Sequence, residues 1–257
     1  MSLLLPLAKT LVLVLPAAHG IYVAADSRYD GGDPVQKDRA RKIFLCGKRA
    51  VCAISGALIL NGRTVHPENG AVKQGSLRID EELEKASAEM PDGRAEEQIE
   101  WLGRRLHAPI RKFWDEFLKD RPIPEPMSSW LGAPSVSTIL YAGIGEDGGA
   151  TVVQMQFPFR ERRVPEGVLH DLGDPALYPA DPARPLAQGS TRCMGIRPDE
   201  PPEVETREQT IATLKALFGR TQESGYCASV VGGPTDIAVI DNEGAAWLSR
   251  KAGDPPK

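Results

Sequence analysis

Two pairs of short apolar runs near the start of the chain constrain its fold more than any other feature. Residues 10–15 and 21–25 flank a turn of sequence Pro-Ala-Ala-His-Gly, and residues 42–46 and 49–55 flank Gly47-Lys48. Apolar runs of this length on either side of a tight turn predict β-hairpins. Neither pair leaves a polar face for water, so we expect the sheet that they form to be covered on both sides.

The rest of the chain switches between helical and strand-like patterns. Apolar residues at spacings of three and four predict helices; the segments are residues 78–90, 94–119 and 205–218. Glycine-containing turns predict two more hairpins, formed by residues 135–145 with 150–157 and by residues 236–240 with 245–249. This order of strands, two helices, strands, helix and strands predicts an α+β protein whose helices cover the outer faces of two sheets.

The predicted organisation is one domain over residues 10–250 with two insertions. The first, near residues 57–75, has the composition of a strand and a loop. The second, near residues 158–187, is proline-rich and charged, and residues 160–185 are expected to be irregular. Residues 1–9 are expected to be an extension or propeptide, and residues 251–257 a flexible tail.

Composition narrows the function classes. The net charge of −4 and the absence of a basic stripe argue against nucleic acid as the main partner. The cysteines form no C-x-x-C pair and lie in apolar runs, so buried, reduced thiols are expected at Cys46, Cys52, Cys193 and Cys227. The four histidines are scattered, and we expect neither a metal site nor a cofactor.

The first twenty residues resemble a signal peptide superficially. No positive charge precedes the apolar run, Lys9 interrupts it, and prolines break it too early for a membrane span. Residues 10–15 are also needed as a core strand. We therefore expect a cytoplasmic protein without membrane contact, and export is the less favoured alternative.

Residues 20–28, Gly-Ile-Tyr-Val-Ala-Ala-Asp-Ser-Arg, taken alone predict a strand that ends in a surface ion pair. The segment resembles the second strand of proteasome β-type subunits. Lys42-Ile-Phe resembles the start of the strand that holds this family's catalytic lysine, and Ile54-Ser-Gly56 resembles the end of the strand whose glycine borders the active site. The separations between Thr10, Asp26, Lys42 and Gly56 match the family pattern without a gap.

The resemblance implies an N-terminal nucleophile hydrolase, with a four-layer αββα sandwich of two antiparallel sheets flanked by helices. Thr10 would become the catalytic N-terminus after removal of residues 1–9, and its free α-amine would accept the hydroxyl proton. Lys42 would favour the ionised hydroxyl, and Asp26 would pair with Lys42.

Three further residues receive roles from the same resemblance. Arg28 would hold the local network, and the backbone N–H of Gly56 would stabilise the oxyanion. Ser190 resembles the serine that assists near the nucleophile's amine. Arg28 and Gly56 have structural alternatives, Arg28 as part of a surface ion pair and Gly56 as a backbone requirement, and the match at Ser190 depends on an alignment through the preceding insertion.

The implied function is a threonine-type endopeptidase that autoprocesses before Thr10 and hydrolyses polypeptides through an acyl-enzyme inside a homo-oligomeric ring, with an unfoldase ATPase as a candidate partner. One alternative is an inactive, proteasome-like assembly protein that keeps its extension. Lys9 in place of a glycine, and Ala228-Ser-Val-Val231 in place of an acid and a serine, favour it. The other alternative is a stand-alone small-molecule amidase.

Overall fold

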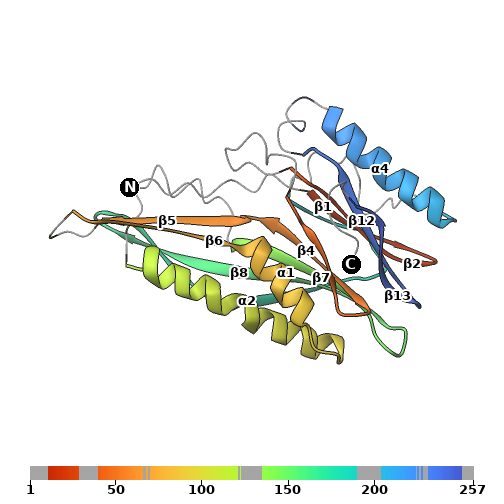
Figure 1. Cartoon of the computed structure of the whole chain (residues 1–257), viewed down its shortest axis with the longest axis horizontal. Helices are drawn as coiled ribbons and strands as arrows, with labels where there is room; N and C mark the ends of the chain where they lie inside the picture. Colours follow the sequence, from red (N-terminus) through yellow and green to blue (C-terminus); the bar gives the residue numbers. More distant parts are fainter. Residues whose placement is uncertain are drawn as a thin grey trace.

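The computed structural model describes residues 11–28, 40–65, 68, 70–120, 122, 135–189, 204–223, 225, 227 and 231–250. Thr10, Ser190, the extension 1–9 and the tail 251–257 lie outside the described residues. Helices and antiparallel strands make up the described part (Figure 1), so the predicted α+β class is confirmed. Within these ranges no helix is both long enough and apolar enough to cross a membrane.

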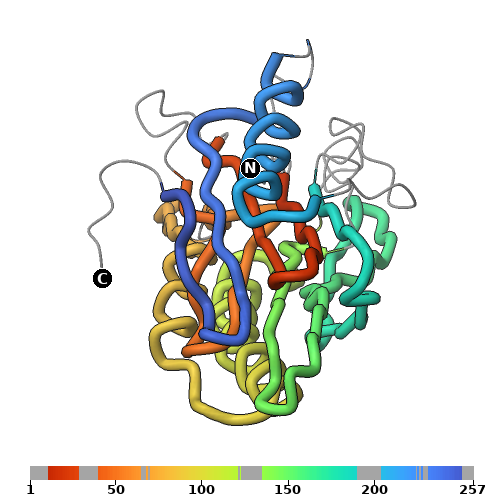
Figure 2. Tube along the Cα trace, turned by 90° about the vertical axis from the view of Figure 1, so that its right-hand side faces the viewer, coloured from red at the N-terminus to blue at the C-terminus, as the bar shows by residue number. Residues whose placement is uncertain are grey.

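The first sheet brings together both ends of the chain. Its order is β11-β1-β2-β12-β13, with β1 at Leu11–Ala17, β2 at Gly20–Asp26, β11 at Leu186–Gly189, β12 at Thr235–Asp241 and β13 at Gly244–Ser249. Figure 2 shows the β1–β2 hairpin (red) beside the β12–β13 hairpin (dark blue). The predicted hairpins in these two regions are confirmed, with ends that differ by one or two residues.

The second sheet has the order β10-β8-β7-β4-β3, and β9 pairs with β8 outside this path. The strands are β3 at Ile43–Cys46, β4 at Ala50–Gly56, β7 at Ser135–Ile144, β8 at Ala150–Val164, β9 at Gly167–Leu172 and β10 at Ala176–Ala180. A separate hairpin consists of β5 at Ile59–Val65 and β6 at Val72–Arg78. The predicted β3–β4 and β7–β8 hairpins are confirmed.

Three apolar cores separate the sheets and helices. The residues between the two sheets include Val12, Val23, Ala53 and Leu140, all of them buried. Helix α4, at Arg207–Glu223, covers the first sheet, where Phe218 belongs to the same core as strands β1 and β2. Helices α1, at Ile79–Glu89, and α2, at Ala95–Phe117, cover the second sheet on its other side (Figure 1). Each of these helices thus packs against one of the two sheets.

The prediction that residues 160–185 are irregular is wrong. Strand β8 continues to Val164, β9 pairs with its far half, and β10 pairs with its near half. The density of prolines and charges misled the prediction. Pro179 lies in β10, which is an edge strand of the sheet. Edge strands tolerate proline because no further strand pairs with their outer side.

The prediction of reduced thiols is also wrong for the cysteines that the structure describes. Cys46 and Cys52 form a disulfide with a Cα–Cα distance of 6.0 Å, and Cys227 is disulfide-bonded as well. In the β3–β4 hairpin, Phe44 faces Cys52 and Cys46 faces Ala50. The two cysteines are therefore diagonal neighbours on one face, a placement that their spacing in the sequence does not reveal.

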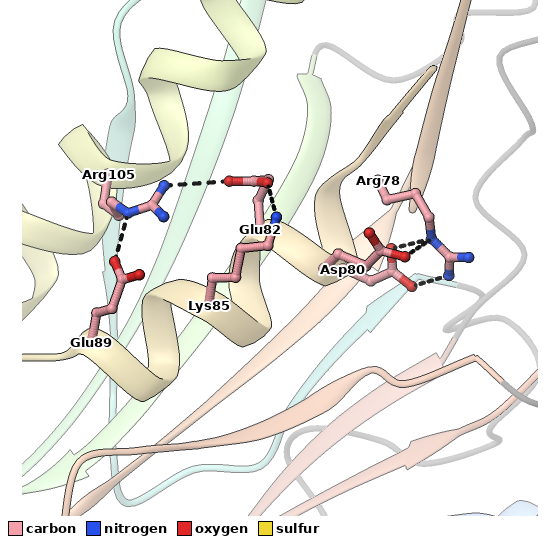
Figure 3. A network of polar contacts seen from close by, with 7 residues as sticks. Arg78, Asp80, Glu82, Lys85, Glu89 and Arg105 are labelled. Atoms are coloured by element: carbon pink, nitrogen blue, oxygen red, sulfur yellow. Dashed lines mark hydrogen bonds and ion pairs between the residues drawn. The ribbon is translucent and has the colours of Figure 1, made fainter. Parts of the chain in front are cut away.

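Charged side chains connect helices α1 and α2 (Figure 3). Arg105 of α2 donates hydrogen bonds to Glu89 and Glu82 of α1, at 3.0 and 3.3 Å. Lys85 contacts Glu82 at 2.7 Å, and the hydrogen bonds from Lys85 and Arg105 lower the pKa of Glu82. Because these groups are partly exposed, the network orients the helices more than it stabilises them.

The aromatic ring of Phe117, at the end of α2, fills a space that two glycines leave in the β5–β6 hairpin. Gly62 and Gly75 are register partners, and Phe117 lies against both. A Cβ at Gly62 would lie 2.6 Å from Phe117 Cβ, at the base of the side chain, whereas a Cβ at Gly75 would meet the tip of the ring. The glycine pair therefore allows the hairpin to contact the end of α2.

Gly62→Ala is expected to lower the free energy of unfolding by about 1–3 kcal/mol, because the new methyl group overpacks the base of the Phe117 side chain. Urea denaturation measures the loss. Gly75→Ala is the matched control and should cost less, because the ring tip can shift. Equal losses for the two variants would contradict this account.

His170 is a buried base in strand β9, opposite Glu161 of β8. Its backbone carbonyl accepts a hydrogen bond of 2.8 Å from Trp114 Nε1. Its Nε2 lies 3.4 Å from Glu161 Oε1, but neither ring nitrogen makes a well-aligned hydrogen bond. Burial lowers the pKa of His170, although Glu161 opposes the shift.

The free energy of unfolding is therefore expected to fall as the pH drops below about 6.5, the ordinary pKa of histidine. The unfolded chain takes up a proton that the folded protein resists, so the contribution of neutral His170 is complete above that pH and is lost below it. Urea denaturation over a pH series tests this. His170→Leu should flatten the dependence of the unfolding free energy on pH. An unchanged dependence would show that other groups cause it.

Candidate functional site

An ion pair between Asp26 and Lys42 is buried where the two sheets meet. Asp26 is the last residue of β2 in the first sheet, and Lys42 directly precedes β3 in the second. Lys42 Nζ lies 2.8 Å from Asp26 Oδ1, and the two side chains are 1% and 0% exposed. The family resemblance implies a pairing of the same two residues, and their catalytic roles stay predictions.

Backbone donors complete the environment of the Asp26 carboxylate. Its Oδ1 also accepts a hydrogen bond of 2.8 Å from Leu11 N. Its Oδ2 accepts from Arg28 N at 3.1 Å and from Gly232 N at 3.2 Å. Burying an ion pair costs so much desolvation that it is seldom a source of stability. A charge pair kept here with this many donors therefore indicates a functional site more than a structural one.

The site is adjacent in sequence to the predicted nucleophile. Leu11 N, which donates to Asp26, belongs to the peptide bond whose carbonyl carbon is that of Thr10. In the sheet, Leu11 is the register partner of Gly189. Thr10 and Ser190 are the chain neighbours of these two partners, and both lie outside the described residues.

Arg28 contacts Asp26 through its backbone N–H, and its side chain lies against Gly232. Its guanidinium lies so close to Gly232 that a Cβ there would be 2.6 Å from Arg28 Nε. Ser27 N donates to Gly232 O at 3.2 Å, and Ser27 Oγ donates to Pro234 O at 2.9 Å. The end of β2 is thus bonded to the glycine segment that precedes β12.

Gly56 ends β4, close in register to the ion pair. Ile54 N donates to Lys42 O at 2.8 Å, so Lys42 lies opposite a residue two positions before Gly56. Gly56 has φ +99°, and a Cβ would lie 3.1 Å from Ser137 Cα. Only glycine fits this backbone without strain. The structural alternative for Gly56 is therefore supported, and its oxyanion role stays a prediction.

Several polar partners of the site were not predicted from the sequence. Leu11 N and Gly232 N take part through backbone atoms, which have no residue signature. Gln188 accepts a hydrogen bond of 3.2 Å from Ser55 Oγ, across the two sheets. The glycine pair before Pro234 was the one visible signal, since close approach to another group often requires glycine.

A buried ammonium fixed by a carboxylate can stabilise negative charge that develops next to it, because the surrounding dielectric is low. Within the described ranges, no group of three or more histidine, cysteine or acidic side chains is placed to hold a metal ion. The arrangement thus suits activation of a nearby hydroxyl. No family model matches the chain, and no curated protein matches it.

Lys42→Met is expected to cost about 3–5 kcal/mol of unfolding free energy, because it removes one partner of a buried ion pair. Guanidinium denaturation measures the loss. The double variant Asp26→Asn/Lys42→Met should recover part of it, since neither charge of the pair remains, but the NH2 group that replaces one carboxylate oxygen then faces a backbone N–H donor. A double variant as unstable as the single one would show that charge is not the cause.

Proposed function

We propose that the chain is a threonine-type peptidase of the N-terminal nucleophile class, with Thr10 as its nucleophile. The observation that carries the proposal is the buried Asp26–Lys42 pair, which accepts the N–H of Leu11, the residue after Thr10. One carboxylate and one ammonium from different sheets are thus joined beside Leu11, the first residue of β1. The resemblance to proteasome β-type subunits predicts this same pairing.

The arrangement of cores supports the fold that this class requires. One core lies between the sheets, one beneath α4, and one beneath α1 and α2. That order is compatible with the four-layer αββα sandwich, which we propose as the architecture. We also propose homo-oligomeric rings with polypeptide substrates, for which the outward-facing helices α1 and α2 offer contact surfaces.

In the proposed reaction, the α-amine of Thr10 takes the proton of its own hydroxyl while Oγ attacks the substrate carbonyl carbon. The Lys42 ammonium stabilises the alkoxide character, and the N–H of Gly56 receives the oxyanion. The C–N bond then breaks, the amine leaves with the proton, and an ester remains on Thr10. Water attacks that ester by the same route and restores the hydroxyl.

A free α-amine requires cleavage between Lys9 and Thr10. The proposed cleavage is intramolecular: Thr10 Oγ attacks the Lys9 carbonyl carbon, the acyl group moves from nitrogen to oxygen, and water hydrolyses the ester. The lysine in place of glycine, together with Ala228-Ser-Val-Val231, favours the second candidate, an assembly protein that retains the extension. The two differ in one measurable property, the mass of the mature chain.

A stand-alone small-molecule amidase is the third candidate. The β5–β6 hairpin begins three residues after Gly56, whereas proteasome β-type subunits continue directly into a helix at this point. A substrate pocket specific to this chain would therefore form beside this hairpin. Light scattering of the purified chain separates a monomer from a ring. The cytoplasmic location stays a prediction, and the disulfides weigh against it because cytoplasmic thiols are kept reduced.

N-terminal sequencing and intact mass of the purified full chain test the main proposal. The parent chain is expected to begin at Thr10, because self-cleavage removes residues 1–9. Thr10→Ala should retain them completely, since no hydroxyl can attack. Thr10→Ser is the matched control that keeps a hydroxyl and should still process.

Two outcomes would overturn the proposal. Unchanged processing in Thr10→Ala would show that another agent makes the cut. A parent chain that retains residues 1–9 would favour the inactive assembly protein.

A further inference from the structure

A second polar contact joins the two sheets at the same end as the Asp26–Lys42 pair. Ser55, next to Gly56 in β4, donates from its hydroxyl to Gln188 Oε1 at 3.2 Å. Gln188 lies in β11 directly opposite Val12, whose side chain belongs to the core between the sheets. The contact thus crosses that core from the end of β4 to the edge that borders β1.

Gln188 is an unfavourable choice for stability alone. The residue is 6% exposed, and its Nε2 is buried without a hydrogen-bond partner among the residues that the structure describes. Turning the amide over would leave the oxygen without a partner instead. An unsatisfied buried polar atom costs about 1–3 kcal/mol, which a leucine of similar size would avoid. A glutamine that is retained at this cost points to a role other than stability.

The geometry assigns that role. Because β1 and β4 belong to different sheets, no backbone ladder sets the distance between Leu11 and Gly56. The Asp26–Lys42 pair connects β2 to β3. The Ser55–Gln188 contact instead connects the residue beside Gly56 to the strand paired with β1.

We propose that Gln188 is a positioning residue that, through Ser55, holds Gly56 at the correct distance from the start of β1. This inference rests on the proposed function, in which Thr10 precedes β1 and Gly56 supplies the oxyanion donor. Such a donor helps only when it faces the position where the negative charge develops. A small shift of β4 would therefore slow acylation without weakening the binding of a substrate.

The test uses the processed full chain and a β-lactone as the acylating probe. Thr10 Oγ forms an ester with the lactone carbonyl carbon, the ring C–O bond breaks, and the hydroxyl proton ends on the released alcohol. Intact mass measures the rate of addition at several probe concentrations, which separates the maximal rate from the half-saturating concentration. Urea denaturation of each variant reports its stability.

Gln188→Leu and Ser55→Ala are each expected to lower the maximal rate by roughly tenfold to a hundredfold, the effect of a misplaced reacting group. The half-saturating concentration should hardly change. The double variant should be no slower than either single one, because both changes remove the same contact. Ser55→Thr, which keeps a hydroxyl, should retain most of the parent rate.

Several results would overturn the inference while leaving the proposed function intact: single variants as fast as the parent, rate losses that multiply in the double variant, or losses that follow the loss of stability. A parent chain with a free Thr10 that does not react with the probe would overturn the proposed function itself, and the inference with it.

Discussion

The buried contact between Asp26 and Lys42 is the interaction around which the end of the molecule is organised. One carboxylate receives the lysine ammonium and backbone N–H groups from three separate segments. It thereby connects the first sheet, the second sheet and the loop before β12. Removing either charge breaks a buried ion pair, which is strongly destabilising, so the segments and the pair depend on one another.

The two sheets hold this contact because each has an apolar face turned toward the other. The core between them continues up to the strand ends, and α4, α1 and α2 cover the opposite faces. With both faces buried, the strands cannot shift by one residue without moving apolar side chains to the wrong side. The register that places Leu11 beside Asp26 is therefore enforced by packing far from the site.

The sequence predicted the parts of the structure that depend on local patterns. Apolar runs around tight turns identified the hairpins, and the spacing of Asp26 and Lys42 within a family resemblance implied their contact, although their chemical role stays a proposal. The contacts of Gly232 and Gln188 join segments that are distant in sequence, and apart from the glycine pair before Pro234 no local pattern signals them. Pro179 misled the prediction because the sequence does not reveal that β10 is an edge strand, and proline is tolerated in edge strands.

The hydrogen bond from Leu11 N to Asp26 has a consequence for the proposed cleavage between Lys9 and Thr10. The Thr10–Leu11 peptide bond lies on the retained side of the proposed cut, so its N–H is present in precursor and product alike. In the proposed mechanism this contact is therefore the same before and after cleavage, and cleavage would convert one amide nitrogen into a basic amine. Precursor and product of the proposed cleavage would then share the described contacts of Asp26 and differ by one titratable group at the start of β1.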